Sequence, residues 1–211
     1  MRYILIHGLG QNSSSWDRTI SYMSEKYRID CPDIIRLLGD KEPTYNNLYP
    51  AFSEYCREFG EPVCLCGLSL GAVLALNYAL DQPETVQSMI LIGAQYKIPK
   101  GLLRIQNAVF RVLPEASFQN FGFRKKGFIQ LSKSLIPLDF SNRIADIRCD
   151  TLILCGEKDN VNKKAARELA DHIPEAELHI VKGAGHEVNV DAPETLASII
   201  NKFWDKRTSK F

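Results

Sequence analysis

The sequence lacks a long hydrophobic run, an excess of charge of one sign and any cluster of metal-ligating residues. No stretch approaches the roughly 20 apolar residues that a membrane-spanning helix needs, so we expect no membrane association. Lysine and arginine number 26 against 25 aspartates and glutamates, and the net charge of +1 gives no indication of a nucleic-acid partner. Cys64 and Cys66 share one strand face but have no histidine or cysteine cluster nearby, so we expect no metal and no cofactor.

We also expect no secretion signal, because the first predicted strand begins at Arg2 and leaves no room for one. We therefore expect a cytoplasmic protein whose six cysteines are free thiols. A length of 211 residues, 45% of them hydrophobic, is typical of one compact domain spanning residues 1–211.

Apolar runs typical of strands alternate with segments whose apolar residues recur at helical spacing, without repeats or low-complexity linkers. The predicted strands are residues 2–6, 27–31, 62–66, 86–93, 151–155 and 178–181. The predicted helical faces lie within residues 16–23, 48–59, 72–80, 165–173 and 196–204. This alternation predicts an α/β fold.

Ser69 stands at the centre of Gly67-Leu68-Ser69-Leu70-Gly71, between a predicted strand and a predicted helix. Glycine two residues before and two residues after a serine at such a turn is the pattern of a nucleophile elbow. Gly67 and Gly71 lack the Cβ atoms that would hold strand and helix apart. The alternative is an ordinary serine at a helix N-cap. We predict that Ser69 is a catalytic nucleophile.

A serine nucleophile needs a base, and the base needs an acid that orients it. Asp159 and His186 each come shortly after a predicted strand, and the order Ser69, Asp159, His186 is that of an α/β-hydrolase triad. Open α/β sheets place their sites past the carboxyl ends of the strands. We therefore predict that these three residues form a catalytic triad.

Other histidines and carboxylates compete for these roles. His172 lies near the end of a predicted helix and His179 within a strand, so we assign both to the scaffold. Glu157 lies in the same loop as the predicted acid and is the alternative to it. Glu187 directly follows the predicted base, and because sequence neighbours rarely orient each other's rings, we expect it on the surface.

A third motif precedes these. The strand at residues 2–6 runs into His7-Gly8-Leu9-Gly10, and Trp16 follows. With this loop, the elbow and the two later loops in order, the chain resembles the α/β-hydrolase superfamily over nearly its whole length. The resemblance implies a six-stranded, mostly parallel sheet in the order 2-1-3-4-5-6 with helices on both faces. It also implies that the two N-terminal strands, which usually form an antiparallel edge, are absent.

The resemblance assigns roles around the nucleophile. It implies that the backbone N–H groups of Leu9 and Leu70 form the oxyanion hole, which requires no particular side chain. It favours Asp159 as the acid. His7 and Gly8 support the oxyanion loop, and we expect His7 to brace that loop, with the role of base as the alternative.

The chain departs from the superfamily where substrate specificity arises. Relatives often carry an Asp-x-x-Gly-x-Gly-x-Ser turn after the second strand, whereas residues 33–40 here read DIIRLLGD, so substrate assignments do not transfer. Residues 94–140 interrupt the alternation and are expected to form a small helical cap. Residues 95–135 carry eight basic residues against Glu115 alone, and five phenylalanines that line an acyl pocket or form the cap's own core. The candidate substrate contacts are Arg104, Phe110, Arg111 and Phe121.

These observations predict a serine hydrolase that cleaves a small-molecule ester or thioester through an acyl-enzyme intermediate. One alternative is a carbon–carbon bond hydrolase or lyase that uses the same triad. The other is a non-catalytic binding protein on a hydrolase scaffold, which would have no need of an intact triad. The sequence indicates neither the acyl group nor an oligomeric state.

Overall fold

Six parallel strands form the centre of the protein in a computed structural model that describes residues 1–98, 114–115 and 125–208. The strands are β1 (Arg2–Ile6), β2 (Ile29–Asp30), β3 (Val63–Leu68), β4 (Val86–Ile92), β5 (Asp150–Gly156) and β6 (Glu177–Val181). Their order is β2-β1-β3-β4-β5-β6, and all five pairings are parallel. The predicted sheet order is confirmed.

The central strands are buried on both faces, which explains their nearly continuous apolar sequences. Every residue of β3 is buried, and β4 and β5 each have a single half-buried residue. The edge strand β6 differs, because four of its five residues are exposed. The site region therefore lies over the rigid centre of the sheet, where β1, β3, β4 and β5 end.

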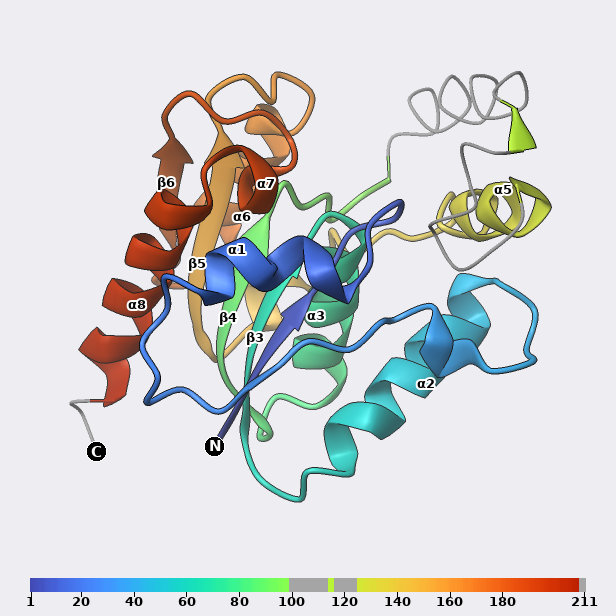
Figure 1. Cartoon of the computed structure of the whole chain (residues 1–211), viewed down its shortest axis with the longest axis horizontal. Helices are drawn as coiled ribbons and strands as arrows, with labels where there is room; N and C mark the ends of the chain where they lie inside the picture. Colours follow the sequence, from blue (N-terminus) through green and yellow to red (C-terminus); the bar gives the residue numbers. More distant parts are fainter. Residues whose placement is uncertain (99–113, 116–124, 209–211) are drawn as a thin grey trace.

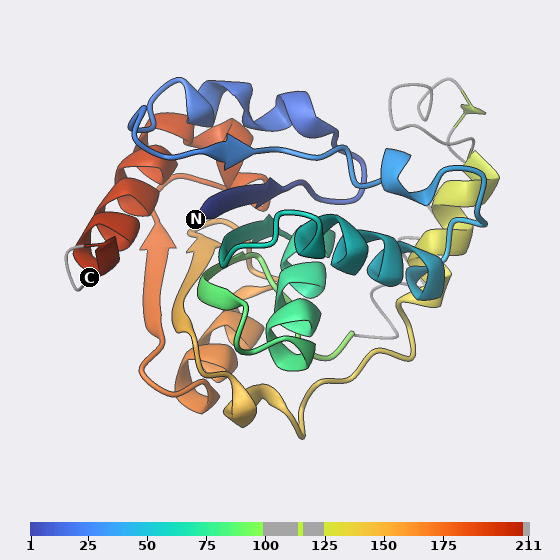
Figure 2. The ribbon, with the colours of Figure 1, turned by 90° about the horizontal axis from the view of Figure 1, so that it is seen from below.

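Helices cover both faces of this sheet (Figures 1 and 2). On one face lie α1 (Asp17–Ile20), α7 (Val188–Asp191) and α8 (Pro193–Thr208). On the other lie α2 (Tyr45–Arg57), α3 (Leu70–Asp81) and α6 (Lys163–His172). Two apolar clusters correspond to these faces, one containing the buried Trp16 and Trp204 and the other Phe52 and Tyr78. A buried α3 agrees with its sequence, which is rich in alanine and leucine.

The first predicted helix is shorter than its apolar spacing suggested. Residues Ser13–Trp16 form a 3₁₀ turn, α1 covers only Asp17–Ile20, and a turn carries the chain on to the buried Met23. The side chain of Asn12 accepts hydrogen bonds from the backbone and the hydroxyl of Ser14. Such local side-chain bonds compete with a regular helix.

The two ends of the segment predicted to be a cap lie side by side. Lys97 and Asp139 form an antiparallel bridge, and the N–H of Phe140 donates to the carbonyl of Tyr96 at 2.8 Å. Within the insertion, α5 (Lys125–Ser134) contacts α2, and the backbone N–H of Tyr45 donates to Ser134 Oγ at 2.7 Å. The candidate contacts Arg104, Phe110, Arg111 and Phe121 lie outside the described residues.

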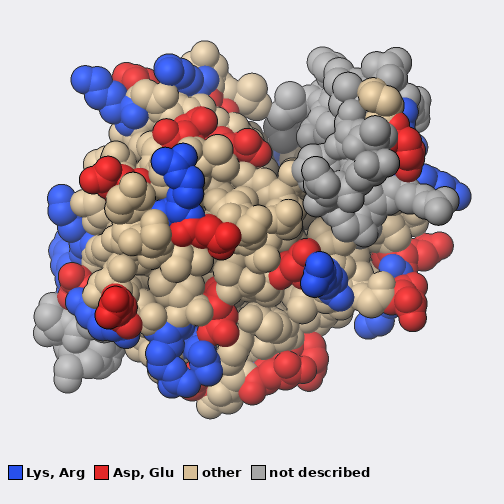
Figure 3. Space-filling view, viewed as in Figure 1, with Lys and Arg blue, Asp and Glu red and all other residues tan. Residues whose placement is uncertain are grey.

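Of the five cap phenylalanines, Phe128 on α5 lies within the described residues, and it is buried. Its ring lies 3.5 Å from the position that a Cβ on Gly10 would occupy, so α5 packs against the loop that follows β1. Positive and negative side chains are interspersed on the face shown in Figure 3. Across the described ranges, no helix is long and apolar enough to cross a membrane.

Candidate active site

Ser69 occupies a strained turn between β3 and α3. Its φ of 53° is one of two positive values among the described non-glycine residues, and such strain is often found at functional sites. A Cβ on Gly67 would lie 2.3 Å from the carbonyl oxygen of Gly71, and a Cβ on Gly71 would lie 2.2 Å from that of Ile6. Both positions therefore require glycine, which explains the spacing of the pentapeptide.

Ser69 stands at the N-cap of α3 but makes no side-chain cap hydrogen bond, so helix capping does not explain this serine. Its side chain is half-buried at the positive end of a twelve-residue helix. A Cβ on Gly8 would lie 3.4 Å from Ser69 Cβ, so the loop after β1 passes directly beside the serine.

Leu9 and Leu70, whose N–H groups are the predicted oxyanion donors, directly follow Gly8 and Ser69. Among the described residues, neither group donates a hydrogen bond, whereas the neighbouring N–H groups of Gly8 and Ser69 do. The first N–H groups of a helix have no intrahelical acceptor, which accounts for Leu70. Backbone N–H groups without an acceptor are the donors that acyl-transfer sites use to hold an oxyanion, and the assignment of these two stays a prediction.

Asp159 and His186 meet past the ends of β5 and β6. Asp159 Oδ2 accepts a hydrogen bond from His186 Nδ1 at 2.7 Å. The aspartate side chain is 4% exposed and the histidine side chain 41%, so one ring edge stays open to solvent. Burial raises the pKa of Asp159, but the hydrogen bonds from His186 and Asn162 outweigh it and hold the pKa below its usual value. The carboxylate is therefore ionised at neutral pH.

Gly93 makes room for the imidazole. It follows β4 with a φ of 57°, and a Cβ there would lie 2.9 Å from both Cε1 and Nδ1 of His186. The same Cβ would lie 3.4 Å from Asp159 Oδ2. The histidine ring therefore lies against bare backbone at the end of a central strand, which restricts its orientation.

Asn162 and Gln95 continue the polar chain behind the aspartate. Asn162 Nδ2 donates to both carboxylate oxygens of Asp159, at 2.9 Å to Oδ1 and 2.7 Å to Oδ2. Its backbone N–H also donates to Oδ1 at 3.3 Å. Gln95 Nε2 in turn donates to Asn162 Oδ1 at 2.6 Å.

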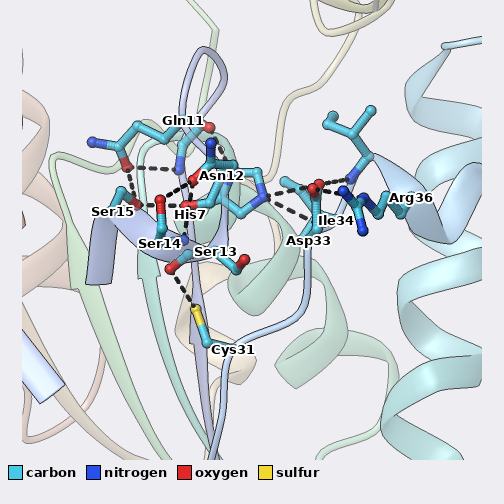
Figure 4. Close-up of polar contacts among 12 residues, drawn as sticks. His7, Gln11, Asn12, Ser13, Ser14, Ser15, Cys31, Asp33, Ile34 and Arg36 are labelled. Atoms are coloured by element: carbon cyan, nitrogen blue, oxygen red, sulfur yellow. Dashed lines mark hydrogen bonds and ion pairs between the residues drawn. The ribbon is translucent and has the colours of Figure 1, made fainter. Parts of the chain in front are cut away.

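His7 directly follows β1 and is fully buried, and Figure 4 shows its ring facing Asp33 and Ile34. Its Nε2 accepts the N–H of Ile34 at 3.1 Å, so the ring proton lies on Nδ1, which donates to the carbonyl of Gly8 at 2.9 Å. Burial lowers the pKa of His7, so the ring is neutral and its 3.6 Å approach to Asp33 is not an ion pair. Both ring nitrogens are therefore hydrogen-bonded to backbone groups, one of Gly8 and one of Ile34.

A buried amide pair joins the oxyanion loop to the chain that follows His186. Gln11 Nε2 donates to Asn189 Oδ1 at 3.2 Å, and Gln11 Oε1 accepts from the backbone N–H of Gly8 at 3.3 Å. Asn189 Nδ2 also donates to the carbonyl of Ser15 at 3.1 Å. Figure 4 shows Gln11 and Ser15 on the same side of the loop. These bonds hold the two loops of the site in one arrangement.

The competing residues lie elsewhere. His172 and His179 are exposed on α6 and β6. Glu157 is exposed and accepts the N–H of Gly183 rather than a histidine proton, and Glu187 is exposed. Within the part of the chain that the structure describes, no hydrogen bond joins Ser69 to His186. Such bonds often form only once substrate is bound.

Several residues of the site are not among the sequence predictions: Gln11, Gly93, Gln95, Asn162 and Asn189. The sequence did carry a signal for Gly93, because this glycine stands at the carboxyl end of a predicted strand. The predicted triad residues also come just after the carboxyl ends of predicted strands. The amides had none, since neutral amides in loops are equally typical of turns and caps. The residues that the structure describes contain no group of three or more His, Cys, Asp or Glu arranged to hold a metal.

Comparisons with known proteins agree with this fold. The chain is 23% identical to the "Putative carbamate hydrolase RutD" of Escherichia coli O81 (strain ED1a), over 93% of this chain and 88% of that protein. It superimposes on the enol-lactonase from Burkholderia xenovorans LB400 with a TM-score of 0.84 and 17% identity, covering 97% and 91% of the two chains. A thermophilic esterase from Thermogutta terrifontis gives 0.81 and 18%, covering 98% and 90%. Residues 3–199 match the alpha/beta hydrolase family, and this chain belongs to that family of hydrolases.

Proposed function

We propose that the protein is a serine hydrolase that cleaves a carboxylic ester or thioester of a small molecule through an acyl-enzyme intermediate. The observation that carries the proposal is the 2.7 Å bond between His186 Nδ1 and the ionised Asp159. With Nδ1 committed to the aspartate, Nε2 is the nitrogen that can accept a proton. Ser69, on its strained turn at the N-terminus of α3, is the nucleophile that this base would serve.

The reaction proceeds in two acyl transfers. Ser69 Oγ attacks the substrate carbonyl while its proton passes to His186 Nε2, and the carbonyl oxygen becomes an oxyanion between the N–H groups of Leu9 and Leu70. Collapse of this intermediate releases the alcohol or thiol, which takes the proton from His186. Water then attacks the acyl-serine by the same route and regenerates the free enzyme. Asp159 stays ionised throughout and stabilises the imidazolium.

The comparisons support a carbonyl substrate. The related proteins are named for action on a carbamate, an enol-lactone and an ester, and each of these has a carbonyl carbon bonded to a heteroatom leaving group. Identities of 17–23% do not transfer a substrate to this chain. A cytoplasmic location and independence of cofactors stay predictions.

The cap suggests the charge of the substrate. Three lysines of α5 and one acidic residue line a hollow of about 480 Å³, whose lining residues are Glu115, Lys125, Lys126, Ile129, Gln130 and Lys133. We expect an anionic group on the substrate to be attracted by this basic region. Arg104 and Arg111, which belong to the same basic segment of the sequence, are the predicted bidentate partners of a carboxylate.

The proposal is tested by stopped-flow hydrolysis of matched chromogenic esters, thioesters and carbamates of increasing acyl length. A burst of leaving group that approaches one equivalent per enzyme, followed by a slower steady state, is the kinetic sign of an acyl-enzyme. Ser69→Ala should abolish the burst. A linear release with no burst and equal rates for wild type and Ser69→Ala across all substrates would overturn the proposal.

A further inference from the structure

Asn162 bonds both oxygens of the Asp159 carboxylate, next to the histidine. Its Nδ2 lies 2.9 Å from Oδ1 and 2.7 Å from Oδ2, and its backbone N–H adds a third bond to Oδ1. Because both oxygens of an ionised carboxylate only accept hydrogen bonds, the atom facing them must be the NH₂ group of the amide. The amide oxygen then faces Gln95, whose Nε2 donates to it at 2.6 Å.

The position of this amide relative to the histidine is also constrained. Asn162 Nδ2 lies 3.1 Å from His186 Nδ1. When His186 Nδ1 carries the proton of its hydrogen bond to Asp159, both nitrogens are donors. The two nitrogens therefore point at the same carboxylate oxygen and make no hydrogen bond to each other. Asn162 is 6% exposed, which keeps water from replacing it at the carboxylate.

We propose that Asn162, oriented by Gln95, is a positioning residue of the active site that fixes the carboxylate plane of Asp159 and shares its negative charge. The inference rests on the proposed serine-hydrolase function. Oδ2 accepts from both His186 and Asn162, and Oδ1 accepts from the side chain and the backbone N–H of Asn162. Without the side-chain amide, Oδ1 would keep the backbone N–H bond, and Oδ2 would be held toward Nδ1 by the histidine bond alone.

Charge sharing has a direction that can be measured. Each donor bond to a carboxylate disperses its charge and stabilises the ionised form. Removal of the amide concentrates that charge on the bond to His186, favours the imidazolium and moves the acid limb of the rate profile to higher pH. The other titratable groups nearby are the buried thiol of Cys155, which burial keeps neutral by raising its pKa to about 11, and Lys163 at the start of α6.

The test compares kcat, KM and the pH profile of kcat/KM for Asn162→Leu, which has similar volume and no donor, with Asn160→Ala as the matched control. Asn160 is exposed two residues away, and its side chain accepts a bond from Lys163 rather than donating to the acid. We expect Asn162→Leu to lower kcat roughly ten-fold with KM nearly unchanged, as loss of a bond to a charged group implies. Its acid limb should move up by about half a pH unit. Asn160→Ala should match wild type.

Gln95→Leu provides a second variant that leaves Asn162 in place. It should lower kcat about three-fold, and in the Asn162→Leu background it should have no further effect, because both changes act on one chain of bonds. Unchanged kcat and an unmoved acid limb in a folded, active Asn162→Leu protein would overturn the inference. If Asn162→Leu fails to fold, Asn162→Ala takes its place. The inference would then be overturned if Gln95→Leu and Asn162→Ala lower kcat additively in the double variant, or if neither lowers it. Equal ester hydrolysis by wild type and Ser69→Ala would instead overturn the proposed function.

Discussion

Replacing Gly93 by alanine should damage catalysis far more than it damages the fold. Gly93 has a φ of 57°, where any side chain is strained, and an added Cβ would lie 2.9 Å from two atoms of the His186 ring. Gly60 offers a matched control, because its φ is 61° and an added Cβ there meets nothing within 4 Å. The two substitutions share the backbone strain and differ only in contact with the active site.

The magnitudes follow from these two terms. Left-handed backbone costs a residue with a Cβ about 1–2 kcal/mol, which both variants should lose from the free energy of unfolding. In Gly93→Ala the imidazole must also retreat from 2.9 Å to ordinary contact at about 3.4 Å, while the contact to Asp159 is already at that limit. A displacement of about half an ångström at a reacting group costs on the order of ten-fold or more in rate.

The assay pairs urea unfolding with kcat/KM on the best ester of the panel, at a temperature where both variants are folded. Gly60→Ala should be destabilised with normal kcat/KM, and Gly93→Ala should be destabilised to a similar extent with kcat/KM reduced at least ten-fold. Equal kcat/KM for the two variants would refute the placement of the histidine ring against Gly93.

Three further predictions concern the triad, pH and charge. Ser69→Ala should stay folded and lose about 10³-fold in turnover, and Asp159→Asn should also be severely impaired while Glu157→Gln is not; the reverse order for the two acids would assign the acid to Glu157. Because burial lowers the pKa of His7, the unfolded chain takes up a proton more readily than the native one, so stability should fall as pH drops below about 6.5. Urea unfolding at several pH values should show a shallower fall in His7→Asn, and an unchanged slope would contradict a neutral buried ring. A carboxylate-bearing ester should have a higher kcat/KM than its neutral counterpart at low salt, with the difference fading at high salt, and equal rates at low salt would reject an anionic substrate.

The sequence predicts the scaffold well because each element carries its own local pattern. Strands β3, β4 and β5 are short apolar runs that need burial on both faces, and the glycines around Ser69 leave a readable signature at fixed spacing. Strand order depends on long-range pairing, so it came from the resemblance and not from the residues alone. The comparisons and the sheet confirm both the family and the order.

The supporting shell of the site could not be predicted in the same way. Gln95 and Asn162 are 67 positions apart, and their bond exists only because β4 and β5 are neighbours in the sheet. The contact between Gln11 and Asn189 likewise spans 178 positions. An amide carries no local pattern that distinguishes such a partner from an ordinary turn residue. The segment from Asp33 to Asp40 could not be interpreted from its sequence for the same reason. The hydrogen bond from the N–H of Ile34 to His7 depends on tertiary packing.

The central claim, that Ser69 is the nucleophile, is tested most directly by labelling with a fluorophosphonate followed by peptide mass spectrometry. The account predicts one adduct per chain on the peptide that contains Ser69, loss of ester hydrolysis in proportion to labelling, and no adduct in Ser69→Ala. Asp159→Asn should label much more slowly, because the base that activates the serine is no longer oriented. The account would be contradicted by an adduct on another residue. It would also be contradicted if protein labelled completely at Ser69 still hydrolysed the ester at the full rate.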